Sequence, residues 1–119
     1  MRYDGPVQGT SRMACEDVEV GGKRIAKGQM VLLMLGAANR DPEQFPEPDR
    51  LDLARRDNRH MAFSRGIHYC LGAELARLEC QVALGAILEQ FPGLRLAETA
   101  LDWNRNHTIR GLKSLRVGF

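Results

Sequence analysis

The sequence has few of the features that mark secreted, membrane or nucleic-acid-binding proteins. Its 119 residues include three cysteines, an odd number with no close pairing, which argues against a disulfide framework and for a reducing compartment. The longest apolar stretch, residues 30–35, is far too short to span a bilayer. The 17 basic and 15 acidic residues give a formal net charge of +2, which requires neither a nucleic acid nor an anionic membrane as partner. We therefore expect a cytoplasmic protein.

The sequence also lacks a zinc motif and a second long helix. Zinc sites use pairs such as Cys-x-x-Cys, and the nearest pattern here is His68-x-Cys70, with no second pair at a usual spacing. The other two cysteines, Cys15 and Cys80, are predicted to be packing residues. By length the chain is one domain, and a globule of this size buries about two thirds of the surface of its unfolded chain.

One segment combines closely spaced glycines with a single cysteine. Gly66 and Gly72 bracket Cys70, and glycine permits a positive φ or lets the backbone approach a bound group. Apolar residues then recur at helical spacing, which predicts a helix over residues 73–91 with Cys70 at or just before its N-terminus. The free amides and the dipole there favour an anion, and the thiolate is the form of cysteine that binds metals.

This segment resembles the heme-binding signature of the cytochrome P-450 superfamily, Phe-x-x-Gly-x-His-x-Cys-x-Gly. A glycine that is common in the family is Ser64 here, and the run Leu75-Ala76-Arg77 that follows is also family-like. The signature positions are filled by Phe63, Gly66, His68, Cys70 and Gly72.

The resemblance implies heme b as the cofactor. Cys70 would be the axial thiolate ligand of the iron, a ligand that favours O–O cleavage. His68 would face a heme propionate, and Phe63 would pack near the thiolate sulfur. The remaining cofactor-binding residues implied by the resemblance are Gly66, Gly72 and Ala76.

The chain before the cysteine segment divides into a β-rich part and an irregular part. Residues 9–35 alternate in polarity around Gly21-Gly22, a hairpin turn signal, and predict a small β meander. The resemblance implies that Arg12, at the start of this part, pairs with a propionate, since an arginine fork binds carboxylate in a bidentate manner. Residues 39–58 are punctuated by prolines and predict a loop.

The resemblance also implies a structural role for two arginines. Arg2 matches the arginine of a Glu-x-x-Arg motif whose glutamate would precede Met1, and Arg50 in Pro48-Asp49-Arg50 would meet both. Without that carboxylate two guanidinium groups would approach with no counter-charge, which is costly if they are buried. We therefore expect the chain to need a missing N-terminal portion of its own fold.

Together these patterns predict an α+β fold. They indicate the C-terminal heme-loop portion of the cytochrome P-450 fold: the meander, the irregular loop, the cysteine loop, one long helix and terminal strands near residues 94–96 and 114–117. Residues 1–119 would form one fragment of a single domain, incomplete relative to the family.

The implied function is that of a bacterial-type heme-thiolate monooxygenase, in fragment or truncated form. The parent reaction inserts one oxygen atom of dioxygen into a small organic substrate, with electrons from a ferredoxin or similar donor. The family's distal helix, with its acid and alcohol pair for proton delivery, has no counterpart here, so heme binding is better supported than catalysis.

Two alternatives remain open. The chain could be a remnant that neither binds heme well nor turns over. It could also be a thiol-based redox or hydrolytic enzyme that uses Cys70 with His68, because a cysteine at a helix N-terminus can be activated. An absorption spectrum of the reduced, carbon monoxide bound protein distinguishes these possibilities from a heme-thiolate protein.

Overall fold

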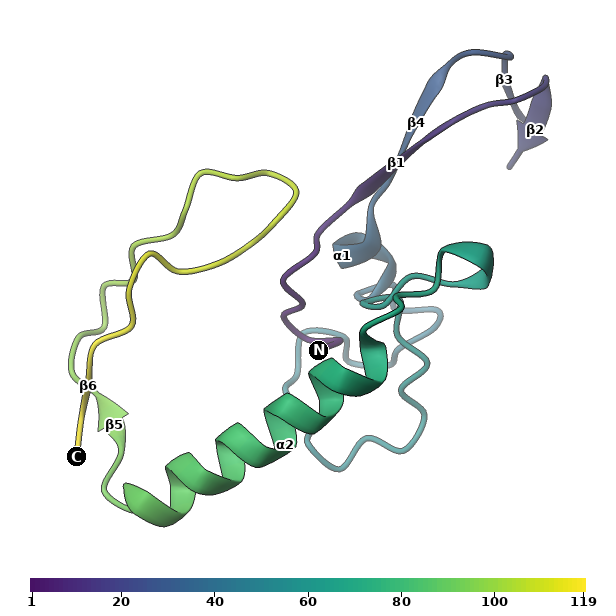
Figure 1. Ribbon diagram of the computed structural model, residues 1–119. Helices are drawn as coiled ribbons and strands as arrows, with labels where there is room; N and C mark the ends of the chain where they lie inside the picture. Colours follow the sequence, from purple (N-terminus) through teal and green to yellow (C-terminus); the bar gives the residue numbers. More distant parts are fainter. The chain divides into compact units, whose positions relative to one another are not determined.

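The computed structural model describes all 119 residues and consists of short strands, one long helix and extensive irregular chain (Figure 1). The chain divides into two compact units. The first unit comprises Met1–Ala62 with Asn106–Arg110, and the second comprises Phe63–Arg105 with Gly111–Phe119. No helix combines the length and the apolar content needed to cross a membrane.

Two antiparallel strand pairs form the β part of the first unit. Strand β1 (Thr10–Met13) pairs with β4 (Met30–Leu33), and β2 (Val18–Val20) pairs with β3 (Lys23–Ile25). The β2–β3 hairpin therefore sits at the end of the β1–β4 ribbon, as Figure 1 shows. The strands were correctly predicted, but the predicted meander order was wrong, because β1 pairs with β4 and not with β2.

The turns explain this pairing order. Gly21 and Gly22 have φ of +57° and +74°, the left-handed pair that closes a two-residue hairpin, so β2 pairs with β3 directly across this turn. Beyond the hairpin, the Ala14 amide donates to the Gln29 carbonyl at 2.9 Å and the Gly28 amide to the Ala14 carbonyl at 2.8 Å. These bonds place the chain after the hairpin beside β1, so that β4 pairs with β1.

A small core holds the rest of the first unit together. Helix α1 (Leu35–Ala38) follows β4 and buries Leu35, while Phe45 is buried in the irregular stretch beyond it. Asn39 is only 2% exposed, and its Oδ1 accepts a hydrogen bond of 2.6 Å from the Met61 amide. A buried side-chain amide thus links α1 to the end of the irregular stretch.

The second unit contains the cysteine segment and the long helix. A 3-10 turn, η1 (Gly66–His68), precedes helix α2 (Ala73–Gln90), and β5 (Arg95–Leu96) pairs with β6 (Val117–Gly118). Phe91 caps α2 and packs on the Phe119 ring at 4.6 Å between centroids. The predictions of a helix over residues 73–91 and of terminal strands are confirmed within a few residues.

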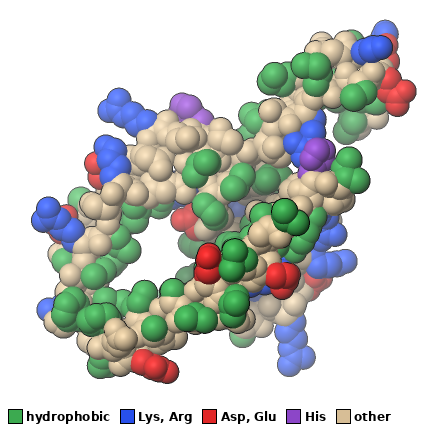
Figure 2. Space-filling view, in the orientation of Figure 1, with side chains coloured by type: hydrophobic (Ala, Val, Ile, Leu, Met, Phe, Trp, Pro, Cys, Tyr) green, Lys and Arg blue, Asp and Glu red, His purple; other side chains and the backbone are tan.

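Helix α2 exposes apolar side chains on two sides. These exposed apolar residues fall into two groups. At 3.6 residues per turn, one group lies on one side of the helix and the other lies nearly opposite. Figure 2 shows hydrophobic side chains along the whole helix. Helices that are apolar all round are typical of the interior of larger proteins. The two groups are Leu75, Leu78 and Val82, and Leu84, Ile87 and Leu88.

The prediction that Cys15 and Cys80 are packing residues is wrong for this chain. Both thiols are free and exposed. Cys80 lies on α2, and Cys15 lies in the short connection between β1 and β2.

Candidate functional site

The backbone around Cys70 is held by short-range hydrogen bonds while its thiol is free. The Cys70 amide donates to the Phe63 carbonyl at 2.9 Å, and the Cys70 carbonyl accepts from the Ala73 amide at 3.2 Å. These bonds close the loop onto the first residue of α2. The thiol itself is exposed and makes no disulfide, so the loop presents a sulfur outward from a defined backbone.

The two glycines that bracket Cys70 serve different physical needs. Gly66 has φ of +63°, in the left-handed region that favours glycine. Gly72 has φ of −87°, which any residue can adopt, and a Cβ added there would meet no atom within 4 Å. Nothing within the chain therefore requires glycine at position 72, whereas the missing side chain would let a bound group come close to the backbone.

Ser64 also adopts the left-handed conformation, with φ of +60°. This is the position at which the family signature commonly has glycine. A residue with a Cβ costs about 1 to 2 kcal/mol in this conformation. Serine at this position therefore carries strain that glycine would not.

An aromatic and cationic cluster joins the loop to α2. Phe63 is 8% exposed, its ring meets the Tyr69 ring edge-on at 6.5 Å, and the Arg77 guanidinium lies 5.0 Å from its centroid. Arg77 also donates to the Tyr69 hydroxyl at 3.3 Å and pairs with Glu74. The hydrogen bond to Tyr69 and the charge of Glu74 raise the pKa of Arg77. Phe63 thus packs against Tyr69 and Arg77 on the buried side of the loop.

The outer surface of the loop suits a flat, largely apolar group such as heme. Ile67 and Leu71 are essentially fully exposed on either side of the cysteine, and Tyr69 is about half exposed. No atom of the chain lies within 4 Å of a Cβ built on Gly66 or Gly72. His68 is exposed and makes no hydrogen bond to the Cys70 thiol. A free thiol, apolar neighbours and an open glycine surface are the features that a heme ligated by thiolate needs.

The predicted site residues fall in both units. Arg12, in β1 of the first unit, is half-buried, and its Nη1 donates to Thr10 Oγ1 at 3.1 Å and to the Ser11 carbonyl at 2.7 Å. It forms no ion pair with an acidic side chain, so its charge is available to a carboxylate. The second unit contains Phe63, Gly66, His68, Cys70, Gly72 and Ala76.

The expected approach of the Arg2 and Arg50 guanidinium groups is not what the structure contains. Arg2 Nη2 lies 3.5 Å from the carbonyl oxygen of Arg50, whereas the Arg50 guanidinium pairs with Glu47 at 3.2 Å and is 66% exposed. The i,i+3 spacing of Glu47 and Arg50 explains this local pairing. Arg2 is itself 5% exposed.

Two residues close to predicted site residues were not themselves predicted from the sequence. One lies near Arg2, and the other lies next to Cys70. Arg55 donates to the carbonyls of Pro46 and Glu47 and lies close enough to Arg2 to lower its pKa. Nothing in the irregular stretch around Arg55 signals that role. Tyr69 was also missed, although its place next to Cys70 and its partner Arg77 on the following helix could have indicated it.

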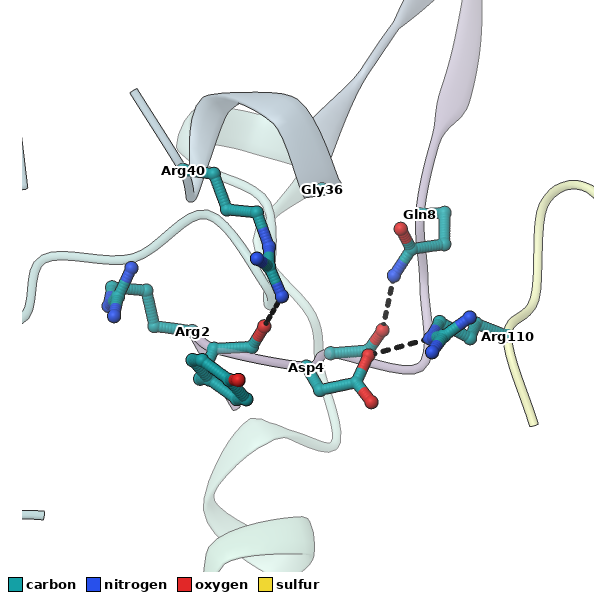
Figure 3. Close-up of a pocket in the computed structure, with 8 residues that line it drawn as sticks. Arg2, Asp4, Gln8, Gly36, Arg40 and Arg110 are labelled. Atoms are coloured by element: carbon teal, nitrogen blue, oxygen red, sulfur yellow. Dashed lines mark hydrogen bonds and ion pairs between the residues drawn. The ribbon is translucent and has the colours of Figure 1, made fainter. Parts of the chain in front are cut away.

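A separate cavity of about 160 Å³ lies between the N-terminal segment and α1 of the first unit (Figure 3). Its cationic side chains are already engaged: Arg40 donates to the Tyr3 carbonyl at 2.8 Å, and Arg110 pairs with Asp4 at 2.8 Å. Gln8 donates to the Gly5 carbonyl at 2.6 Å. These contacts tie residues 106–110 to the start of the chain.

Comparison with known proteins decides the family. The family description Cytochrome P450 matches residues 1–102. The chain belongs to the cytochrome P450 family. Cytochrome P450 CYP107DY1 of Priestia megaterium is 50% identical over 121 residues, which cover all of this chain and 29% of that protein. The 6-deoxyerythronolide B hydroxylase of Saccharopolyspora erythraea is 46% identical over 119 residues, which cover 98% of this chain and 30% of that protein.

Solved P450 structures match the fold as well. A crystal structure of P450BioI in complex with a fatty-acid-ligated acyl carrier protein superposes with a TM-score of 0.96 at 44% identity. The match covers 99% of this chain and 31% of P450BioI. The predicted family and fold class are thus confirmed, and the chain spans about a third of the length of the P450s that it matches.

Proposed function

We propose that this chain is the thiolate-bearing portion of a heme-thiolate monooxygenase, with Cys70 as the ligand of the heme iron. One observation carries the proposal. The structure presents a free, exposed thiol on a hydrogen-bonded loop, beside Gly72, whose missing side chain nothing else in the chain explains. Family membership supplies heme as the group that such a loop binds in P450s.

The roles of the other residues follow from their chemistry. Gly66 and Gly72 would leave room for the porphyrin, and Ala76, on the first turn of α2, has only a methyl side chain. Phe63 holds the loop through its contacts with Tyr69 and Arg77. Arg12 and His68 would bind the propionates, since Arg12 forms no ion pair and a charge-assisted hydrogen bond is stronger than a neutral one.

When bound, the heme supplies the oxygen-activating chemistry of the parent enzyme, and the thiolate provides electron density to the iron. In the whole protein we expect insertion of one oxygen atom of dioxygen into a small organic substrate. The electrons would come from a ferredoxin or similar donor. The unpaired cysteines agree with a cytoplasmic location.

We also propose that a further portion of the fold is a required partner. The relatives are more than three times as long as the part that this chain matches. Helix α2 exposes apolar side chains on two sides, which a P450 of full length has the residues to cover. Residues 1–119 would then be one segment of a single domain.

The absorption spectrum of the reduced, carbon monoxide bound protein tests the thiolate assignment. Heme is added to the purified chain, and the thiolate-specific red-shifted band is expected. Cys70→Ser should abolish that band. Cys15→Ser and Cys80→Ser are matched controls, because all three thiols are free and exposed, and both should keep it. Loss of the band in a control but not in Cys70→Ser would refute the assignment.

The thiol-enzyme alternative has less support. A nucleophilic cysteine needs a base within hydrogen-bonding reach. The structure contains no hydrogen bond between Cys70 and His68, although only one residue separates them. The remnant alternative is decided by the same spectrum, since a chain that does not bind heme produces no band.

A further inference from the structure

One face of the β1–β4 ribbon (Figure 1) carries two methionines directly opposite each other. Met13 of β1 pairs with Met30 of β4, and their side chains are 64% and 72% exposed. The alternate residues Arg12 and Val31 are less exposed, so the methionines lie on the more exposed face of the ribbon. Directly opposite residues have Cβ atoms about 4.5 to 5.5 Å apart. Because methionine side chains are flexible, both thioether sulfurs can reach one ion.

A thiol extends this methionine pair. Cys15 follows Met13 by two residues, and its exposed thiol lies 3.9 Å from the Met13 carbonyl oxygen. The ladder continues past Met13, because the Ala14 amide donates to the Gln29 carbonyl at 2.9 Å. Side chains alternate along a strand, so Cys15 lies on the same face as Met13. Three sulfur atoms from two strands therefore gather at the end of the ribbon.

Two oxygen donors next to this sulfur cluster already have partners. The Asp17 carboxylate accepts a hydrogen bond of 2.8 Å from the Lys27 amide and pairs with Arg24, and these bonds lower its pKa. The side-chain oxygen of Gln29 accepts a hydrogen bond of 2.8 Å from the Ala26 amide. Both oxygen donors are thus committed to the β2–β3 hairpin and its connections. Sulfur is the donor type that the cluster presents.

We propose that Cys15, Met13 and Met30 form a binding site for a soft monovalent cation, Cu(I). Single exposed apolar side chains are ordinary on protein surfaces, but one thiol and two thioethers on one face form a set of soft ligands. Thiolate and thioether ligands select Cu(I) over harder cations. Cys15 binds as the thiolate, and its proton passes to the solvent. One thiolate neutralises the charge of one Cu(I), and the exposed face lets the ion enter without any movement of the strands.

This sulfur site is separate from the proposed heme ligand. All three sulfurs lie in the first unit, whereas Cys70 lies in the second. Arg12, to which we assign a propionate, alternates with Met13 and so lies on the opposite face of the ribbon. The inference therefore does not depend on heme binding, and its test has a readout that involves no heme.

The test adds Cu(I) under anaerobic conditions to the heme-free 119-residue chain carrying Cys70→Ser and Cys80→Ser, so that one thiol remains. NMR follows the methyl groups of the five methionines. The Met13 and Met30 signals are expected to shift together and to saturate at a single ion per chain. The Met34 signal is the internal control and should not move, although its side chain is also half exposed. Zn(II), whose usual ligands include thiolate but not thioether, should shift neither Met13 nor Met30.

Variants of the same chain measure what each sulfur contributes, by competition with a chromophoric Cu(I) chelator. Cys15→Ser should abolish the binding. Met13→Leu and Met30→Leu nearly conserve volume at exposed positions, and each should weaken the binding about tenfold or more. Met34→Leu and Glu16→Gln are the matched controls for thioether and carboxylate ligands, and both should bind Cu(I) as tightly as the parent chain.

Three results would overturn the sulfur site. One is an affinity for Cu(I) that Met13→Leu and Met30→Leu leave unchanged, because the thiol alone would then be the ligand. Another is a Met34 signal that moves as far as those of Met13 and Met30, or a Zn(II) titration that shifts the same pair. The third is an NOE spectrum without cross-strand contacts between Met13 and Met30, because the ribbon that brings the sulfurs together is then not formed.

Discussion

At the scale of single residues, Ser64 is a place where this chain carries avoidable strain. Its φ of +60° is a conformation in which glycine has no Cβ penalty. Ser64→Gly should raise the free energy of unfolding by about 0.5 to 1 kcal/mol, because relief of about 1 to 2 kcal/mol of strain exceeds the added entropy of the unfolded chain. Urea denaturation measures this difference.

Ser114→Gly is the control for this substitution. Ser114 has no positive φ, so glycine there adds only entropy to the unfolded chain and should lower stability. Equal effects of the two substitutions would contradict the strain argument.

His68 and Arg12 are the residues to which we assign the propionates. His68→Ala and Arg12→Ala should each weaken heme retention about tenfold or more, since each removes a charge-assisted hydrogen bond worth about 1.5 to 3 kcal/mol. The thiolate band should persist in both. Arg24→Ala is the control, because Arg24 is a strand arginine already paired with Asp17. Heme affinities within twofold of the original chain in both test variants would refute the propionate roles.

At the scale of elements, the loop that contains Cys70 and the helix α2 that follows it differ in packing. Phe63 is buried beneath Tyr69 and Arg77, whereas Leu78 on α2 is 57% exposed. Phe63→Ala should therefore cost about 3 to 5 kcal/mol of stability, and Leu78→Ala less than about 0.5 kcal/mol. Urea denaturation of the 119-residue chain compares the two. A large cost for Leu78→Ala would mean that α2 is already covered in the isolated chain.

At the scale of the whole molecule, the chain buries little apolar surface for its length. Only four hydrophobic residues are buried: Leu35, Phe45, Phe63 and Ala73. Two of them belong to each unit, so neither unit has a large core. We therefore expect additional covering surface to raise the stability of this chain.

The residues present in this chain also predict the activity of the 119 residues alone. A Cys70 thiolate would provide electron density to a bound heme, but no residue of this chain is assigned to deliver protons on the opposite side of that heme. We expect slow, unselective, peroxide-driven oxidation at most. Product formation is measured with an electron donor and dioxygen, with and without the N-terminal portion of a related P450 supplied as a separate chain. Coupled, regioselective turnover by the 119 residues alone would refute the proposed need for that portion.

The sequence by itself determined the features that depend on neighbours along the chain. The spacing of apolar residues determined α2, Gly21-Gly22 determined the hairpin turn, and the signature around Cys70 determined the family. Each of these signals is contained within a few turns or residues, where backbone preference and periodicity decide the outcome.

Only the tertiary structure decided which distant segments meet. The pairing of β1 with β4, the choice of Arg55 over Arg50 beside Arg2, and the exposure of Cys80 depend on contacts between residues far apart in sequence. The irregular stretch that contains both arginines has no periodicity from which side-chain directions could be inferred. Packing and charge, rather than local propensity, determine which arginine turns toward Arg2 and which remains at the surface.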